Sequence, residues 1–267
     1  MAAIVEFKAV GRNYGAKRAV DDLNLELRTG ELFALLGHNG AGKTTTIKML
    51  VGLLRPQDGA VLVGGYDIVE ATREAVSVLG YVPDQPYLYD KLSGREFLEF
   101  IAGMYGYDAR QAKVLIDREV GRFGLASFVD DLCESYSHGM KQRTVFAAAM
   151  LHNPQVLVVD EPMVGLDPQS IRLVKDLLRE EVSKGLCVFM STHTLAAAEE
   201  IADRIGVMRQ SKLLFTGTVD ELRQAHPDRQ PSLESLYLHL MNTEDSSSEV
   251  PPAGDSHAAL GEDAKSP

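Results

Sequence analysis

The chain has 267 residues, of which 45% are hydrophobic, and its formal net charge is −11. This length and apolar content suffice for a full hydrophobic core, either in one large domain or in a domain with a sizeable insert. Because contacts to nucleic-acid phosphates need clustered lysine and arginine, the acidic balance argues against a nucleic-acid partner.

The N-terminal part of the chain has the patterns of β-strands followed by a helix. Residues 4–10 and 20–27 alternate as strands do, and they look like an antiparallel pair. Residues 31–36 form a short apolar run that ends at a glycine, and a helical pattern follows over residues 43–53.

A glycine-rich segment lies between that apolar run and the predicted helix. Residues 37–45 match the phosphate-loop pattern G-x-x-x-x-G-K-[ST]. Glycines let the backbone approach an anion, and the N–H groups and the helix dipole then favour phosphate oxygens. We expect Lys43 to reach the terminal phosphates and the Thr44 hydroxyl to bind Mg²⁺. The predicted nucleotide-binding residues of this loop are Gly37, His38, Asn39, Gly40, Ala41, Gly42, Lys43, Thr44 and Thr45.

The character of the sequence changes between about residues 84 and 136. Residues 95–105 and 109–123 read as amphipathic helices. This stretch is therefore predicted to be a helical insert in the sheet domain.

Two acidic residues follow the next buried strand. Residues 156–159 are apolar, and Asp160 and Glu161 come directly after them. Ligands of open α/β sheets bind at the carboxyl ends of the strands. We expect Asp160 to hold Mg²⁺ through a bound water and Glu161 to polarise the attacking water.

A third candidate follows the apolar run 186–190. His193 stands at the end of this predicted strand, where it could donate to the terminal phosphate and sense its presence. One more apolar run, residues 205–208, comes later. The predicted fold class is α/β: a phosphate-loop NTPase with a mixed, mainly parallel sheet flanked by helices, an N-terminal antiparallel β subdomain and a helical insert.

The C-terminal end differs from the rest in composition. We assign residues 1–240 to the nucleotide-binding domain and 241–267 to a disordered acidic tail, since six acids and one lysine follow residue 242. The apolar runs are too short to cross a membrane, and the first residues lack a signal-peptide pattern. Cys133 and Cys187 form no CxxC pair, which fits free thiols in a reducing compartment.

The combination of motifs resembles a known family. Residues 136–143, with the sequence YSHGMKQR, look like the signature L-S-G-G-Q-K-Q-R of ATP-binding cassette (ABC) transporter nucleotide-binding domains. Gly165, Leu166 and Asp167 look like the loop that follows the acid pair in this family, and Tyr14 lies where the family places an aromatic ring on adenine. The resemblance runs from about residue 4 to residue 222.

The resemblance implies an ATPase that powers transport as one of a pair of domains. Two such domains, as a homodimer or a heterodimer, face each other head to tail, with each ATP between the phosphate loop of one and the signature of the other. The signature residues Ser137, His138, Gly139 and Met140 would thus act on the partner's ATP, with Ser137 and Gly139 contacting its terminal phosphate. Asp167 would couple the two sites. The helical insert would transmit closing and opening to integral membrane subunits, with the protein on the cytoplasmic face of the cell membrane.

The sequence departs from the family pattern at three positions. Asp84 occupies the slot where the family usually has glutamine, and Gln85 follows it. Either could serve, and the register favours Asp84, which is then a candidate Mg²⁺ ligand as well. In the signature, His138 replaces glycine and Met140 replaces glutamine.

Residues 83–96 and 44–50 resemble the subset of cassettes that serve exporters of drugs, sodium, haem or polysaccharide, which favours export over import. Two alternatives are a soluble ABC-type ATPase of translation or DNA repair, and a regulatory module that does not hydrolyse ATP. The transported substrate is not indicated by this chain.

Overall fold

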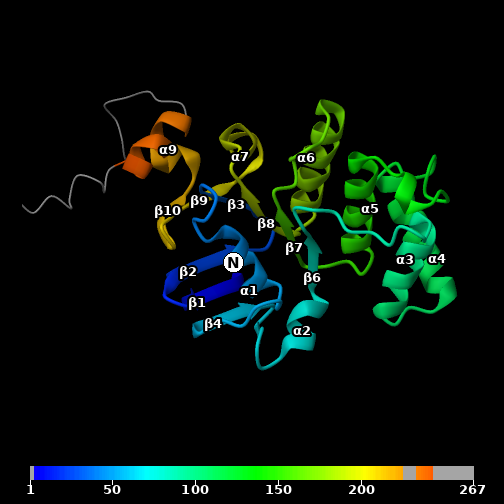
Figure 1. Ribbon diagram of the computed structural model, residues 1–267, viewed down its shortest axis with the longest axis horizontal. Coiled ribbons are helices and arrows are strands. Elements are labelled where there is room, and N and C mark those ends of the chain that lie inside the picture. The colour runs from blue at the N-terminus through cyan, green and yellow to red at the C-terminus, as the bar shows by residue number, and fades with distance from the viewer. Residues whose placement is uncertain (1–2, 225–232, 243–267) are drawn as a thin grey trace, which may run out of the picture.

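Two β-sheets form the framework of residues 3–224 and 233–242, the part of the chain that the computed structural model describes (Figure 1). In this part, the smaller sheet is antiparallel, with the strand order β2-β1-β4-β5. Its strands are β1 (Ala3–Tyr14), β2 (Lys17–Arg28), β4 (Asp58–Val63) and β5 (Tyr66–Asp67). The predicted antiparallel pairing of the opening strands is confirmed.

The larger sheet is mixed and mainly parallel, as predicted. Its order is β10-β9-β3-β8-β7-β6, and β10 alone in this sheet pairs antiparallel, with β9. The strands are β3 (Leu32–Leu36), β6 (Leu79–Val82), β7 (Val156–Asp160), β8 (Cys187–Thr192), β9 (Arg204–Arg209) and β10 (Lys212–Gly217). Phosphate loop, acid pair and His193 all follow strands of this sheet, so parallel pairing brings them to one edge.

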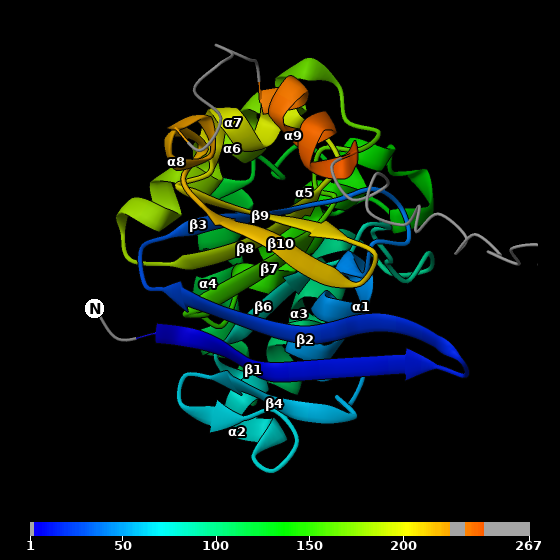
Figure 2. The same cartoon turned by 90° about the vertical axis from the view of Figure 1, so that its left-hand side faces the viewer.

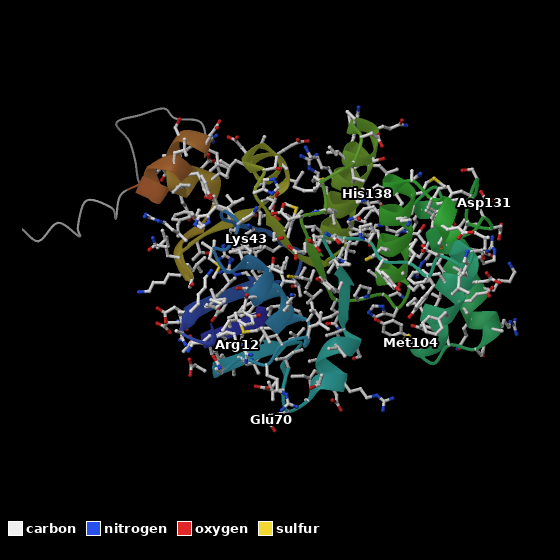
Figure 3. The ribbon with its side chains drawn as sticks, in the orientation of Figure 1. Arg12, Lys43, Glu70, Met104, Asp131 and His138 are labelled. Atoms are coloured by element: carbon white, nitrogen blue, oxygen red, sulfur yellow. The ribbon has the colours of Figure 1, made fainter. Side chains whose placement is uncertain are left out.

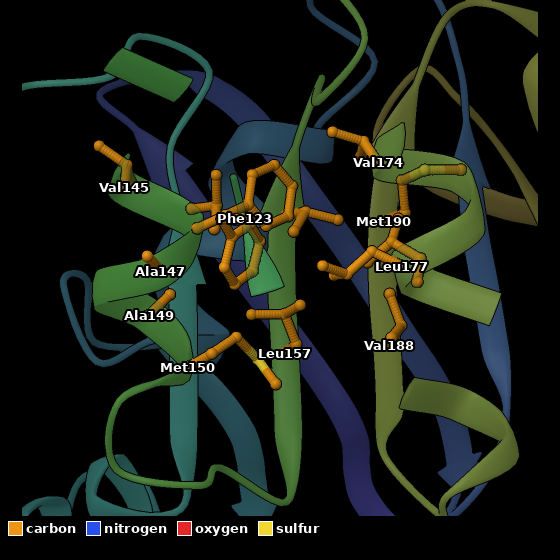
Figure 4. Close-up of a cluster of buried hydrophobic side chains, with 14 of the residues drawn as sticks. Phe123, Val145, Ala147, Ala149, Met150, Leu157, Val174, Leu177, Val188 and Met190 are labelled. Atoms are coloured by element: carbon orange, nitrogen blue, oxygen red, sulfur yellow. The ribbon is translucent and has the colours of Figure 1, made fainter. Parts of the chain in front are cut away.

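Helices and the smaller sheet cover the two faces of the larger sheet. Alternate residues of β3 face opposite sides: Phe33 and Leu35 pack with α1 (Lys43–Leu50) and the antiparallel sheet, whereas Ala34 packs on the other side. Figure 2 shows β1, β2 and β4 stacked against one side of the larger sheet. The opposite side packs against α6 (Pro168–Ser183) and α7 (Leu195–Ile201). Side chains of β7 and β8 meet those of α5 and α6 in Figure 4.

A group of helices stands at the β6 end of the larger sheet (Figure 1). It consists of α3 (Gly94–Met104), α4 (Ala109–Arg122) and α5 (His138–Met150), with a short 3₁₀ turn, η1 (Cys133–Ser135). Capping boxes start α3 and α4, with Ser93 and Asp108 as the N-cap residues. The helices predicted over 95–105 and 109–123 are therefore confirmed to within one residue at each end.

The remaining helices show where the sequence patterns were less exact. The helix after the phosphate loop ends at Leu50, not at residue 53, because the chain turns at Gly52, which has a φ of 75°. Helix α2 (Thr72–Ser77) precedes β6, and α8 (Val219–Gln224) and α9 (Leu233–Asn242) follow β10. The predicted disordered tail starts two residues too early, because residues 241 and 242 end helix α9. Its other residues, 243–267, lie outside the described residues.

In the described part of the chain, no helix has both the length and the apolar character that crossing a membrane requires.

Candidate nucleotide-binding site

The phosphate loop links β3 to α1, and its glycines have conformations that suit a close turn. Gly40 and Gly42 have φ values of 83° and 118°. A Cβ atom on Gly42 would lie 2.4 Å from the carbonyl oxygen of Ala19 and 2.5 Å from Cε of Met208. Glycine at position 42 therefore permits both the backbone conformation and the contact between the loop and β2.

Lys43 folds back inside this loop. Its side chain is 6% exposed, and Nζ donates to the carbonyl of Gly37 at 2.6 Å. The same Nζ lies 3.8 Å from Oε1 of Glu161. Burial lowers the pKa of Lys43, and the charges of Glu161 and Asp160 partly oppose this shift. The loop thus holds a cation beside the acid pair.

Ser191 ties the two acids together at the ends of β7 and β8. Asp160 is 2% exposed, and the Ser191 hydroxyl donates to its carboxylate. Burial raises the pKa of Asp160 and the bond from Ser191 lowers it, while the charges of Asp84 and Glu161 raise it further. The N–H of Glu161 donates to the Ser191 hydroxyl at 3.1 Å.

Glu161 lies between a lysine and a histidine. Besides its contact with Lys43, its Oε2 accepts from Nδ1 of His193 at 2.9 Å. Its backbone φ of 49° is in the left-handed region, uncommon for a residue with a side chain. Such conformations occur where the surroundings fix the residue.

A cavity of about 300 Å³ brings together most of the predicted nucleotide and metal ligands. Gly37 and Ala41 are buried and do not line the cavity, although the carbonyl of Gly37 accepts from Lys43. The wall is formed by Tyr14, Lys17, Ala19, His38, Asn39, Gly40, Gly42, Lys43, Thr44, Thr45, Asp84, Asp160 and Glu161.

The structure separates the two candidates for the slot after β6. Asp84 lines the nucleotide cavity, whereas Gln85 lines a neighbouring hollow of about 630 Å³. His193 lies in that hollow too, along with His138. Asn39, Asp84 and Glu161 line both spaces, so the two are adjacent.

The signature residues are at the start of α5, apart from the cavity. Ser137 caps α5 by accepting from the N–H of Met140 at 3.3 Å. A Cβ on Gly139 would lie 3.8 Å from Oδ2 of Asp167, the residue that caps α6. Backbone and side-chain hydrogen bonds from Ser170 lower the pKa of Asp167. Within the described part of the chain, the nucleotide cavity is lined by none of the four signature residues, Ser137, His138, Gly139 and Met140.

His138 holds the loop that leads from the acid pair to α6. Its Nε2 donates to the carbonyl of Val164 at 3.2 Å, and its ring packs against Gly165, whose φ is 74°. Figure 3 shows His138 well separated from Lys43.

Three contributors to the site were not singled out from the sequence. Lys17 and Ala19 line the cavity, and Ser191 joins the acids. Lys17 pairs with Tyr14 across the β1–β2 hairpin, so the predicted antiparallel pairing could have indicated that Lys17 lies at the site. No sequence pattern indicated Ser191 beyond its place at the end of a strand.

The oxygen atoms at the site can supply part of the coordination shell of Mg²⁺. Asp160, Asp84 and the exposed hydroxyl of Thr44 line one cavity. Among residues 3–224 and 233–242, no group of three or more acids, histidines or cysteines is arranged to hold a metal by itself. Mg²⁺ usually takes one or two carboxylates and completes its shell with water and substrate phosphates, so the donors fit that ion bound with a nucleotide.

The fold and this site together define a nucleotide-binding domain of the phosphate-loop class. The family model described as ABC transporter matches residues 20–164. The chain therefore belongs to the ABC transporter family, as an ATPase domain.

Similar proteins include ATP-binding proteins of bacterial transporters. The chain is 37% identical over 242 residues to the probable multidrug ABC transporter ATP-binding protein YbhF of Escherichia coli (strain K12), covering 90% of this chain but 42% of YbhF. It is 35% identical over 228 residues to the bacitracin transport ATP-binding protein BcrA of Bacillus licheniformis, covering 84% of this chain and 72% of BcrA.

Two solved structures show the same fold. The structure of an ATP-binding subunit of an ABC transporter matches with a TM-score of 0.83 and 32% identity, covering 89% of this chain and 99% of the other. CbiO1 of Clostridium perfringens, part of the transporter complex CbiONQ, matches with a TM-score of 0.74 and 25% identity at the same coverage.

Proposed function

We propose that this protein binds and hydrolyses ATP to power export through membrane subunits on separate chains. The observation that carries the proposal is the convergence of Lys43, Asp160 and Glu161 on the cavity walled by the phosphate loop. The multidrug and bacitracin transport proteins among its relatives support the direction of transport.

Different residues of the cavity bind the phosphates and the base of the nucleotide. The loop N–H groups and Lys43 bind the phosphates, because the buried ammonium group is poorly solvated and has much to gain from an anion. Tyr14, which also lines the cavity and is 49% exposed, stacks on the base.

Asp160, through a bound water, the Thr44 hydroxyl and Asp84 would hold Mg²⁺. When bound, the ion neutralises charge on the phosphates and polarises them toward attack. Asp160 suits this role because burial and neighbouring acids raise its pKa, which a divalent cation would reverse.

Glu161 orients the attacking water and accepts its proton, which requires a carboxylate fixed in one position. Its contacts with Lys43 and His193 and its left-handed backbone support this role. His193, which is 56% exposed, turns toward the terminal phosphate and binds it.

The signature acts on nucleotide held by a second ATP-binding domain, a copy of this chain or a related one. Ser137 and Gly139 contact that partner's terminal phosphate from the N-terminus of α5, where helix N–H groups favour an anion. Asp167, packed beside Gly139, links the two sites. The separation of these residues from the chain's own cavity supports a role toward a partner.

An apolar groove beside the group of helices is the proposed contact with the membrane subunit. It has a volume of about 660 Å³ and lies between α3, α5 and β6. Tyr87 and Met104 at its rim are 73% and 71% exposed, and Leu53 is 67% exposed. Apolar side chains this exposed mark an interaction surface when they are contiguous. This contact would hold the protein at the cytoplasmic face of the cell membrane. The net charge of −11 argues separately against a nucleic-acid partner.

The test separates ATP turnover from transport. Lys43→Ala should abolish binding of ATP with Mg²⁺, whereas Lys48→Ala, an exposed lysine on the same helix, should not. Glu161→Gln should still bind ATP but turn it over about 10²- to 10⁴-fold more slowly. Equal turnover by Glu161→Gln and the unchanged protein would remove Glu161 from its role.

The membrane partner is tested by purification from detergent-solubilised membranes. A chain with several membrane-spanning helices should accompany the unchanged protein, and Met104→Asp should lose it while keeping ATP binding. Recovery of the protein without any such chain would contradict the proposed transporter role.

A further inference from the structure

The turn between β9 and β10 has an unusual backbone. Gln210 and Ser211 have φ values of 45° and 73°, in the left-handed region that glycine usually occupies. Ser211 is also 6% exposed, which is rare for a residue in a hairpin turn. A conformation of this kind persists only when the surrounding structure holds it in place.

Three hydrogen bonds hold Ser211, and they reach two different parts of the nucleotide site. Its N–H donates to the carbonyl of Ala41 in the phosphate loop at 3.1 Å. Its hydroxyl donates to the carbonyl of Arg18 in β2 at 2.7 Å. Its own carbonyl accepts from the N–H of Asp21, also in β2, at 2.8 Å.

The two parts that Ser211 joins both line the cavity. The phosphate loop supplies Lys43, while the β1–β2 hairpin supplies Tyr14 and Lys17. Figure 2 shows the β9–β10 turn beside β2 and near α1. The side chain of Arg18 donates to Asn13, next to Tyr14, at 3.1 Å, so a fixed backbone at residue 18 also fixes the hairpin.

We infer that Ser211 is a positioning residue that sets Tyr14 against the phosphate loop, and so governs binding of the nucleoside part of the ligand. The inference rests on the proposed nucleotide binding. The backbone bonds to Ala41 and Asp21 are kept whatever side chain stands at position 211, whereas the bond to Arg18 needs the hydroxyl. Removing the hydroxyl should therefore loosen the hairpin at residue 18 and leave the loop in place.

Two ligands distinguish the phosphate loop from the hairpin. ATP contacts both, while inorganic tripolyphosphate has no base or ribose and contacts the phosphate loop alone. With Mg²⁺ present, Ser211→Ala should raise the Kd for ATP about fivefold, the effect of one typical net hydrogen bond. The Kd for tripolyphosphate should not change. Gln210→Ala, a matched change at the neighbouring left-handed residue, should leave both values unaltered.

Two further variants keep the test decisive. Ser211→Gly retains both backbone bonds and adopts a φ of 73° without strain, so it should fold and still show the weaker ATP binding. In a Tyr14→Ala background, Ser211→Ala should have no additional effect on ATP, since the stacking ring is already gone.

Three results would overturn the inference: unchanged ATP binding in Ser211→Ala and Ser211→Gly, an equal loss for tripolyphosphate, or a persisting effect in the Tyr14→Ala background. Failure of the unchanged protein to bind either ligand would instead refute the proposed nucleotide site.

Discussion

Ser191 offers a sharp test of how the acid pair is held. It is fully buried at the end of β8, donates to the Asp160 carboxylate and accepts from the N–H of Glu161. Ser191→Ala removes both contacts and changes little else in volume. The N–H of Glu161 keeps a second acceptor, the carbonyl of Ser191 at 3.2 Å, so the cost falls mainly on Asp160.

The expected loss follows from the burial of Asp160. A buried acceptor deprived of its donor costs about 1–3 kcal/mol of folding free energy. For domains near this size 1 kcal/mol shifts Tm by roughly 2–4 °C, which predicts a fall of about 2–12 °C. The bond from Ser191 also lowers the pKa of Asp160, so its loss raises that pKa and weakens the carboxylate as a metal ligand.

Thermal unfolding followed by circular dichroism measures the first effect, and a Mg²⁺ titration of ATP turnover measures the second. Ser77→Ala is the control, because that serine is exposed and its hydroxyl donates to the carbonyl of Glu74 at 2.7 Å. A Tm equal to that of the control, together with an unchanged Mg²⁺ requirement, would refute the role given to Ser191.

Three other changes have defined outcomes. Gly42→Ala places a Cβ 2.4 Å from a backbone carbonyl of β2, so the Kd for a fluorescent ATP analogue should rise at least about tenfold; normal binding would contradict the steric account. Glu119 is fully buried and accepts from Arg122 at 2.9 Å, and Glu119→Ala should cost about 1–3 kcal/mol in urea unfolding, unlike an exposed glutamate such as Glu99 changed in the same way. Burial lowers the pKa of His152, so as the pH falls below about 6.5 the unfolded chain takes up a proton before the folded chain does, and the folded state loses stability. His152→Asn should reduce this loss by up to about 1.4 kcal/mol per pH unit. Identical stability profiles for the two proteins between pH 7 and 5 would contradict the contribution of His152.

The sequence predicted those parts of the site that depend on local patterns. The phosphate loop was readable because its glycines, its lysine and the flanking strand and helix are contiguous in the chain. Short apolar runs that end in polar residues likewise predicted the parallel strands and placed Asp160, Glu161 and His193 at one edge. Fold class and family follow from these features and are confirmed.

The parts that the sequence did not predict depend on contacts between distant residues. The bond from Ser211 to Arg18 joins positions 193 residues apart, and no local pattern marks either partner. Ser191 is one of several polar residues at strand ends, and only the fold shows that it lies between two carboxylates. The choice between Asp84 and Gln85 needed the exact path of the chain after β6.

The exposed apolar rim around Tyr87 and Met104 has a consequence for how the protein is made. A copy of the chain without the proposed membrane partner keeps this apolar surface in water, where self-association of two copies would bury it. Production of the soluble chain alone should therefore give concentration-dependent clumping that a single aspartate at position 104 relieves.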